Sequence, residues 1–233
     1  MFDLIAFDAD DTLWDNERLF HAAEQRLVEM FGGQHDPAVV SKALYDTEMR
    51  NLRYFGYGIK SFTLSMVEAA VELSGESVSA EHIQAILVGA KTNFEADVQL
   101  MRGVQETVEQ LSRTHDLMIL TKGDLLDQEA KIARSGIAGY FKYVEIVSEK
   151  SKEGYRALLE KYDVKPERFL MIGNSIRSDV LPVAAIGATA VLVAYADTWE
   201  HENWISEEEA FLKYYELEHV GELPALIEKL QRG

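Results

Sequence analysis

Residues 1–15, MFDLIAFDADDTLWD, join an apolar run to an abrupt cluster of carboxylates. The segment from Phe2 to Phe7 is almost entirely apolar, as is typical of a strand covered on both faces of a parallel sheet. Asp8, Asp10 and Asp11 follow directly at its carboxyl end, which is where open α/β sheets bind their ligands. The stretch therefore predicts a buried strand with a chemical site at its end.

The spacing of these carboxylates indicates a charge that must be compensated. Asp8 and Asp10 are two residues apart and share one side of an extended chain. Crowded carboxylates stay ionised together at neutral pH only beside a cation or strong hydrogen-bond donors, and a hard cation such as Mg²⁺ meets that need. The alternative is that Asp10, Asp11 and Thr12 only close the strand as turn and cap residues. For this stretch alone the turn is the simpler interpretation, so the rest of the chain has to decide.

The composition excludes several classes of protein. The 233 residues are 47% hydrophobic and 27% charged, which supports a substantial core. The 40 Asp and Glu residues outnumber 23 Lys and Arg residues, and without a basic cluster we expect no nucleic-acid partner. The absence of Cys excludes disulfides and thiol nucleophiles. The first apolar run is too short for a signal peptide or a membrane span, so we expect a cytoplasmic protein with no membrane partner and leave its oligomeric state open.

The hydrophobic periodicity divides the chain into two kinds of sequence. Residues 16–97 are helical in pattern, and we expect four helices at about residues 20–31, 37–53, 61–73 and 79–94. After Gly103 the pattern alternates between helices and strands, with strands expected at about residues 117–120, 143–147, 169–172 and 190–193.

This alternation predicts an α/β fold with a Rossmann-like parallel sheet and helices on both faces. The first strand belongs to the same sheet, so the expected domains are a catalytic core of residues 1–15 and 98–233 and an inserted all-α cap of residues 16–97. Aromatic residues interleaved with acids after the last clear strand favour ordinary packing, and the alternatives are a loop near the site or a partner surface. They are Trp199, His201, Trp204, Tyr214 and Tyr215.

Four of the expected strands end in polar groups that suit a single task. Thr and Lys side chains donate hydrogen bonds to an anion and carboxylates hold a metal ion, so together they predict a phosphate site. We prefer Lys150 to Lys152 because Lys150 directly follows its strand, and Lys122 is a further candidate for the phosphate pocket. The groups at the four strand ends are Asp8 with Asp10, Thr121, Lys150, and Asn174 with Asp179.

This ordered set resembles the haloacid dehalogenase-like hydrolase superfamily, in particular its phosphatase branch with a helical cap inserted after the first strand. The resemblance covers essentially the whole chain. The matching segments are DADDTLWD at residues 8–15, ILTKGD at 119–124, VSEKS at 147–151 and IGNSIRSD at 172–179.

The resemblance implies a role for each matching residue. Asp8 would be the nucleophile that forms a phosphoaspartyl intermediate, and Asp10 the general acid for the leaving group and then the base for the hydrolytic water. Thr121 and Lys150 would hold the transferring phosphoryl group. The metal ligands would be Asp8, the backbone carbonyl of Asp10 and the segment containing Asn174 and Asp179, with Mg²⁺ as the cofactor.

The expected activity is Mg²⁺-dependent hydrolysis of a small phosphate monoester, such as a sugar phosphate or a nucleotide. Asp10 argues against a 2-haloacid dehalogenase, because the dehalogenases that resemble these phosphatases lack an acid at this position. Asn174 departs from the Asp that is common in the family, and an amide attracts Mg²⁺ less than a carboxylate does. A non-catalytic module that binds a phosphorylated ligand is therefore the main alternative, and a phosphomutase is a further one.

A glycine-rich break, YFGYG at residues 54–58, interrupts the helical insert. One interpretation is that the break dips toward the core site, where Arg53 and Tyr57 would contact the substrate and select the leaving group. The other is that the residues around it form a solvated helix end and turn, and the sequence favours neither. The residues concerned are Arg50, Arg53, Tyr54, Tyr57 and Lys60.

Overall fold

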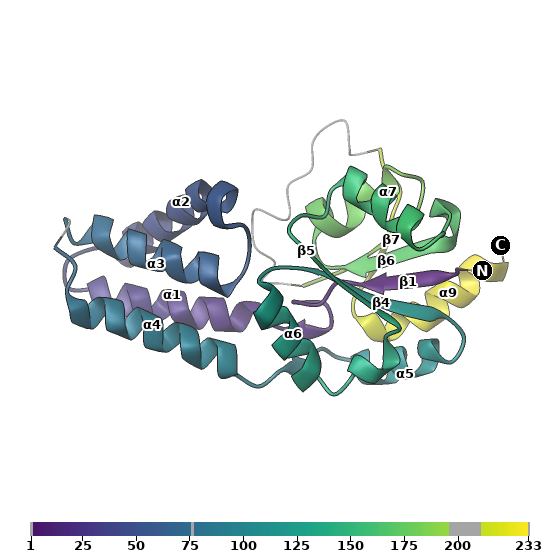
Figure 1. Cartoon of the computed structure of the whole chain (residues 1–233), viewed down its shortest axis with the longest axis horizontal. Coiled ribbons are helices and arrows are strands. Elements are labelled where there is room, and N and C mark those ends of the chain that lie inside the picture. The colour runs from purple at the N-terminus through teal and green to yellow at the C-terminus, as the bar shows by residue number, and fades with distance from the viewer. Residues whose placement is uncertain (1, 76, 196–210, 233) are drawn as a thin grey trace. The chain divides into compact units, whose positions relative to one another are not determined.

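The computed structural model describes residues 2–75, 77–195 and 211–232 (Figure 1). Trp199, His201 and Trp204 lie outside these residues. The chain forms two compact units. One unit consists of Met1–Glu17, Val98–Lys122 and Ala130–Gly233, and the other of Arg18–Asp97 and Gly123–Glu129.

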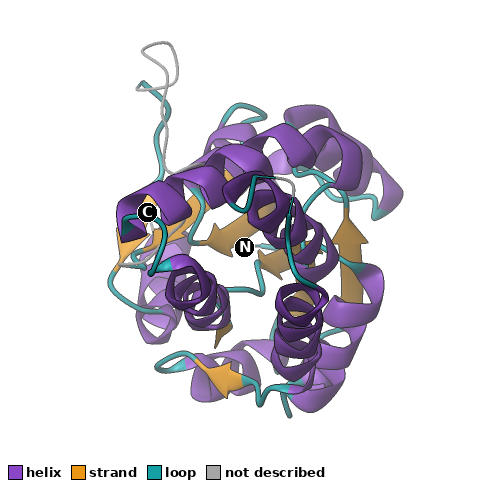
Figure 2. Cartoon of the chain, turned by 90° about the vertical axis from the view of Figure 1, so that its left-hand side faces the viewer, coloured by secondary structure: helices purple, strands orange, loops and turns teal. Residues whose placement is uncertain are grey.

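The first unit is built on a six-stranded sheet with the order β5-β4-β1-β6-β7-β8, in which every neighbouring pair is parallel. β1 lies between β4 and β6, so the carboxylates that follow it emerge near the middle of the sheet. Figure 2 shows the strands in orange among the helices. The strands are β1 (Leu4–Phe7), β4 (Asp116–Lys122), β5 (Tyr143–Val147), β6 (Phe169–Gly173), β7 (Thr189–Val193) and β8 (Tyr215–Leu217).

Helices cover both faces of this sheet (Figure 1). Ile5 and Phe7 of β1 belong to the core cluster that includes the apolar residues of α5 (Val104–Ser112) and α9 (Leu223–Arg232). Leu4 and Ala6 point to the opposite face, where they share a cluster with α7 (Lys152–Lys161). All four residues are buried, which explains why β1 is apolar without alternation. The predicted α/β fold with a parallel sheet and helices on both faces is confirmed.

The structure contains elements that the sequence did not predict. β8 is an additional edge strand that includes Tyr215, and only three residues with an exposed central Glu216 were too weak a signal for a strand. β6 is followed by a π-helical turn, Ile176–Val180, and by the short α8 (Leu181–Ala184). Pro182 stands in the first turn of α8, where its missing N–H costs no helical hydrogen bond.

Two short strands lie where the chain leaves the sheet and returns to it. β2 (Trp14–Asp15) pairs antiparallel with β3 (Gln99–Leu100), and the amide of Met101 donates to the carbonyl of Leu13 at 2.9 Å. β2 comes only six residues after β1, so the segment that carries the three carboxylates is held at both ends.

The second unit contains the helices that follow β2. Asp36 caps α2 by accepting from the amide of Ala38 at 2.9 Å, with Pro37 in the first turn. Phe31, Leu44 and Met66 are among the buried residues of its own core. Among the described helices of the chain, none is long and apolar enough to cross a membrane. The helices are α1 (Glu17–Phe31, which begins in the first unit), α2 (Pro37–Phe55), α3 (Ile59–Leu73) and α4 (Ala80–Glu95).

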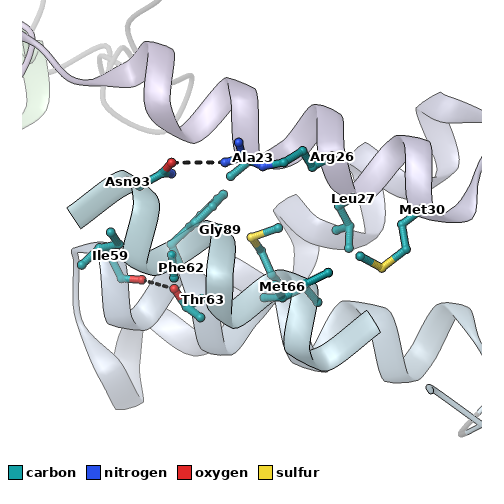
Figure 3. A pocket seen from close by; sticks show the side chains of 13 residues that line it. Ala23, Arg26, Leu27, Met30, Ile59, Phe62, Thr63, Met66, Gly89 and Asn93 are labelled. Atoms are coloured by element: carbon teal, nitrogen blue, oxygen red, sulfur yellow. Dashed lines mark hydrogen bonds between the residues drawn. The ribbon is translucent and has the colours of Figure 1, made fainter. Parts of the chain in front are cut away.

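A small pocket lies inside this helical unit, between α1, α3 and α4 (Figure 3). Its walls are mostly apolar, and the guanidinium of Arg26 donates to the side-chain oxygen of Asn93 at 3.1 Å along its edge. The cavity has a volume of about 50 Å³. That is room for a few water molecules.

Candidate active site

Asp8 lies at the end of β1 and is almost completely buried. Its amide donates to the carbonyl of Ile172 at 2.8 Å and so continues the ladder between β1 and β6 by one residue. Burial raises the pKa of Asp8 to about 7; the ammonium of Lys150 acts in the opposite direction, and the charges of Asp179 and Asp10 raise it further. The carboxyl group is therefore fixed by the sheet in a place where its negative charge needs a counter-charge.

Lys150 supplies one counter-charge. Its ammonium donates to Oδ1 of Asp8 and, at 2.6 Å, to Oδ1 of Asp179, and only 1% of its side chain is exposed. Burial alone would lower the pKa of Lys150, but the carboxylates of Asp179 and Asp8 outweigh it and hold the pKa above its usual value. Lys150 is thus a charged group between two buried carboxylates, whereas Lys152 is half-buried in the first turn of α7.

Asp179 enters the site from the π-helical turn after β6. Its Oδ2 accepts from the amide of Ser175 at 3.1 Å, and its own amide donates to the carbonyl of Ser175 at 2.9 Å. The turn thereby points the carboxylate back across Gly173 toward Lys150. A residue that the sequence assigned to a strand end is therefore held by the local turn that follows the strand.

Asn174, directly after β6, contacts the segment that follows β1. Its Oδ1 accepts from the hydroxyl of Thr12 at 3.2 Å, and the side chain is half-buried. Thr12 therefore joins the end of β1 to the end of β6.

Thr121 and Lys122 lie at the end of β4, next to β1 in the sheet. Thr121 is buried, and its hydroxyl donates to the carbonyl of Lys122 at 3.3 Å. The ammonium of Lys122 donates to Oγ of Ser178 at 2.8 Å. These contacts connect the end of β4 to the turn that carries Asp179.

Asp11 is the residue for which the turn-and-cap interpretation holds. Its backbone has φ of 60°, and its Oδ1 accepts from the amides of Asn16 at 2.8 Å and Glu17 at 2.9 Å, where α1 begins. Burial raises the pKa of Asp11 to about 7, against the effect of these two backbone hydrogen bonds. Asp11 therefore shapes the turn.

Asp10 has a partner that the sequence did not reveal. Lys131, from α6 (Leu125–Arg134), places its ammonium 2.8 Å from both carboxylate oxygens of Asp10, and the indole N–H of Trp14 donates to Oδ1 at 2.7 Å. A lone lysine in a helix normally indicates a solvated face. The feature that points to Lys131 is the reversed pattern of α6, in which Leu125 and Leu126 are exposed and polar residues are buried.

The donor set is compatible with a hard divalent cation. Asp8 and Asp179 are two buried carboxylates that share one ammonium, so negative charge exceeds positive charge among these three side chains. Asn174 and the backbone carbonyl of Asp10 add neutral oxygens, and oxygen-only ligands suit Mg²⁺. Within the part of the chain that the structure describes, no three His, Cys, Asp or Glu side chains form a metal-binding group. The set therefore depends on the amide and the carbonyl as well as on the carboxylates.

The cap residues singled out in the sequence belong to the helical unit. There the guanidinium of Arg53 lies 4.6 Å from the centre of the Tyr54 ring, and Arg50 donates to Glu72 at 2.6 Å. Tyr57 is half-buried in the glycine-rich break. Roles for Arg53 and Tyr57 in substrate binding stay predictions.

Asp124, at the start of α6, contacts Lys60 near the glycine-rich break. Its Oδ2 accepts from the amide of Lys60 at 2.8 Å. The ammonium of Lys60 lies 3.3 Å from the other oxygen. Asp124 therefore ties the start of α6 to the start of α3.

Comparison with known proteins places this arrangement in a family. A family model described as haloacid dehalogenase-like hydrolase matches residues 2–187. The chain is 24% identical to glyceraldehyde 3-phosphate phosphatase of Pyrococcus furiosus, over 98% of this chain and 93% of that protein. It is 23% identical to a 5-amino-6-(5-phospho-D-ribitylamino)uracil phosphatase of Escherichia coli, over 96% and 95%.

A solved structure agrees with these matches. The crystal structure of a haloacid dehalogenase-like family hydrolase from Xanthomonas campestris superposes with a TM-score of 0.87 at 36% identity, covering 99% of this chain and 92% of that one. The family model and this likeness both span most of the chain, and the residues gathered around Asp8 come from the segments that first suggested the resemblance. The chain belongs to the haloacid dehalogenase-like hydrolases.

Proposed function

We propose that the protein is a Mg²⁺-dependent phosphatase that hydrolyses a small phosphate monoester through a phosphoaspartyl intermediate on Asp8. The observation that carries the proposal is the position of the Lys150 ammonium between the carboxylates of Asp8 and Asp179. A carboxylate is a competent nucleophile toward phosphorus only where positive charge offsets the repulsion between two anions. Lys150 supplies part of that charge and also holds Asp8 in one orientation.

The first half of the reaction transfers the phosphoryl group to Asp8. A carboxylate oxygen of Asp8 attacks phosphorus, a new P–O bond forms, and the bond from phosphorus to the leaving oxygen breaks. Asp10 gives its proton to that oxygen, so the dephosphorylated leaving group departs as an alcohol. Thr121, Lys122 and Lys150 are the donors that we assign to the oxygens of the phosphoryl group.

The second half releases inorganic phosphate. Asp10, now ionised, takes a proton from a water molecule whose oxygen attacks phosphorus. The bond between phosphorus and Asp8 breaks, and Asp8 returns to its carboxylate form. The same side chain thus serves as acid and then as base.

A bound Mg²⁺ would be held by Asp8, the backbone carbonyl of Asp10, Asn174 and Asp179. When bound, it would supply charge stabilisation for the phosphoryl oxygens. Asn174 contributes no charge to this set, so we expect the metal to bind more weakly than it would beside a third carboxylate.

The substrate class rests on the relatives. Their names identify phosphatases for glyceraldehyde 3-phosphate and for a phosphoribitylamino-uracil, which are both small phosphorylated metabolites. We propose the same class for this chain, with residues 16–97 acting as a cap whose Arg53 and Tyr57 help to choose the leaving group. The cytoplasmic location expected from the sequence stays a prediction.

Release of inorganic phosphate from a panel of esters, with Mg²⁺ and with EDTA, tests the proposal. The panel is glyceraldehyde 3-phosphate, glucose 6-phosphate, phosphoglycolate, AMP and 4-nitrophenyl phosphate. We expect Mg²⁺-dependent release that falls at least about 100-fold in Asp8→Asn. Lys142→Met is the matched control, because it breaks an exposed ion pair with Asp116 at the opposite end of β4 and should keep full activity.

The outcomes separate the candidate functions. Equal release by Asp8→Asn and the unaltered protein would contradict the proposal, because the release would not depend on the nucleophile. No release by well-folded protein, combined with a higher melting temperature in inorganic phosphate, would instead favour the binding module that Asn174 suggested.

A further inference from the structure

Lys131 is a buried lysine whose position depends on Asp10. Its ammonium lies 2.8 Å from Oδ1 and 2.8 Å from Oδ2 of Asp10, and 3.2 Å from Oδ1 of Asn16. Only 8% of the Lys131 side chain is exposed, against 24% for Asp10. Removing an ammonium from water costs several kcal/mol unless charged partners replace the lost hydration. Asp10 and Asn16 provide this replacement.

The helix that carries Lys131 is built to bring polar groups inside. Leu125 and Leu126 are about 60% exposed, whereas the residues on the opposite side of α6 are buried. This pattern reverses the usual amphipathic helix, so packing alone does not explain it. The buried residues, spaced as one helical stripe, are Asp127, Gln128, Lys131, Ile132 and Ser135.

Trp14 holds the same carboxylate from a second direction. Its indole N–H donates to Oδ1 of Asp10 at 2.7 Å, and the ring itself is 1% exposed. The backbone below Asp10 is also fixed, since the carbonyl of Ala9 accepts from the amides of Leu13 at 2.8 Å and Trp14 at 3.3 Å. Because Lys131 of α6 and Trp14 of β2 both donate to this short side chain, the Asp10 carboxylate is held in a single orientation.

We propose that Lys131 and Trp14 are positioning residues that aim the carboxyl group of Asp10 for both of its proton transfers. The inference rests on the proposed function, in which Asp10 protonates the leaving oxygen and then accepts a proton from water. Because Lys131 reaches both oxygens of Asp10, one contact persists while the other oxygen carries the proton. Neither residue has to touch the substrate for this role.

A pair of substrates that differ only in the leaving group isolates the first transfer. Phenyl phosphate needs a proton on its leaving oxygen far more than 4-nitrophenyl phosphate does, because 4-nitrophenolate is a stable anion. We expect Lys131→Met to lower kcat/KM for phenyl phosphate about 30-fold and for 4-nitrophenyl phosphate less than about 3-fold. Lys131→Arg keeps the donors and should recover part of the loss, and Lys142→Met should match the unaltered protein on both substrates.

The second transfer has its own readout. With 4-nitrophenyl phosphate, slow hydrolysis of the phosphoaspartyl group should give a burst of 4-nitrophenolate followed by a lower kcat in Lys131→Met. A lysine with a merely structural role would change neither the ratio between the two substrates nor the burst.

A double-mutant cycle identifies the residue through which Lys131 acts. Asp10→Asn should itself lower activity on phenyl phosphate about 100- to 1000-fold, and Lys131→Met should add less than about 2-fold in that background. If the losses of activity caused by Asp10→Asn and Lys131→Met multiply in the double variant, the proposal is overturned. A gain of activity in Lys131→Met would also overturn it, because the contacts would then hold Asp10 away from the substrate.

Two further results are distinguishable. If Lys131→Met lacks a cooperative unfolding transition, Trp14→Phe takes its place in the same cycle, because it removes the indole donor and keeps an aromatic ring. If the unaltered protein turns over no ester, the phosphatase assignment fails before any variant is compared. If it turns over both esters and the variants keep its substrate ratio and show no burst, only the role of Lys131 and Trp14 fails.

Discussion

The Cα of Gly173 lies directly against the carboxylate of Asp179: a Cβ built on Gly173 would stand 2.2 Å from Oδ2 and 2.4 Å from Cγ of Asp179. Real Cβ atoms do not approach other heavy atoms so closely. Glycine at the end of β6 is therefore the condition under which Asp179 can turn back and reach Lys150.

Gly173→Ala should displace the Asp179 carboxylate and with it Lys150. We expect a loss of phosphatase activity of about 100-fold, since catalytic groups tolerate misplacement by only a fraction of an ångström to about 1 Å. Gly139→Ala is the control, because its Cβ would meet nothing within 4 Å. Equal activities of the two variants would show that the turn adapts without cost to catalysis.

Gly89→Ala should stabilise the protein by about 0.5 to 1 kcal/mol. The new methyl group would lie 3.6 Å from Nε of Arg26 at the wall of the small pocket, and alanine is the better residue inside a helix. Gly58→Ala should do the opposite, because Gly58 has φ of 116° and its Cβ would lie 2.7 Å from the amide nitrogen of Asp124. Urea denaturation of both variants checks the prediction, and a shift of the same sign in both would contradict it.

Glu48 should make stability depend on pH. Burial, and next the charge of Glu24, raise the pKa of Glu48 from 4.5 to about 8. Folding therefore binds a proton between these two values, so the unfolding free energy falls as the pH rises through that window and levels off above it. Glu48→Gln removes this dependence. Between pH 5 and pH 8 the stability advantage of Glu48→Gln over the unaltered protein should grow by about 3 to 4 kcal/mol.

Urea denaturation at a series of pH values measures this gain. Glu24→Gln offers a second test, because removing the neighbouring charge should lower the pKa of Glu48. The pH range over which stability falls should then become narrower. A stability difference between Glu48→Gln and the unaltered protein that stays constant with pH would refute the assignment.

Asp11→Ala should cost about 2 to 3 kcal/mol of unfolding free energy. The substitution places alanine at φ of 60° and removes the acceptor for the amides of Asn16 and Glu17. Asp11→Asn tolerates the same backbone and keeps a side-chain oxygen, so its cost should stay below about 1 kcal/mol. Thermal and chemical denaturation followed by circular dichroism compare the two, and equal losses would count against the turn as the cause.

Asn174→Asp should strengthen Mg²⁺ binding by about 10-fold. A carboxylate adds a negative charge to the oxygen donors and still accepts the hydroxyl of Thr12. The Mg²⁺ concentration for half-maximal phosphate release and calorimetric titration of Mg²⁺ should both report the change. Unchanged affinity in the titration would exclude Asn174 as a ligand.

The central strands of the sheet were largely predictable because buried strands are rich in apolar residues. Tyr143–Val147 was expected with the bounds that the structure has, and Phe169–Gly173 and Thr189–Val193 differ by one residue. β8 was missed because an edge strand of three residues, two of them exposed, lacks the apolar run that reveals a central strand.

The site was predictable as a set of strand ends but not in its supporting contacts. Asp8, Thr121 and Lys150 stand at such ends, where parallel strands bring distant residues to one edge. The turn that aims Asp179 is held by its contacts with Ser175. Asp10 contacts Lys131, from a helix that looks solvated in sequence. Contacts of this kind depend on packing between elements, which local patterns do not encode.

β1 leaves the ribosome well before its partners in the sheet, because Leu4 is in register with Asp116 and Phe169, more than 100 residues later. At roughly 10 residues per second, more than about 10 seconds of synthesis separate this strand from its partners. During that interval it is an apolar segment of the kind that chaperones protect. Lys150 is 142 residues from Asp8, so the two charges of the site meet only when synthesis is well advanced. Activity therefore appears late in folding. The moment at which it appears during translation would show when the sheet is complete.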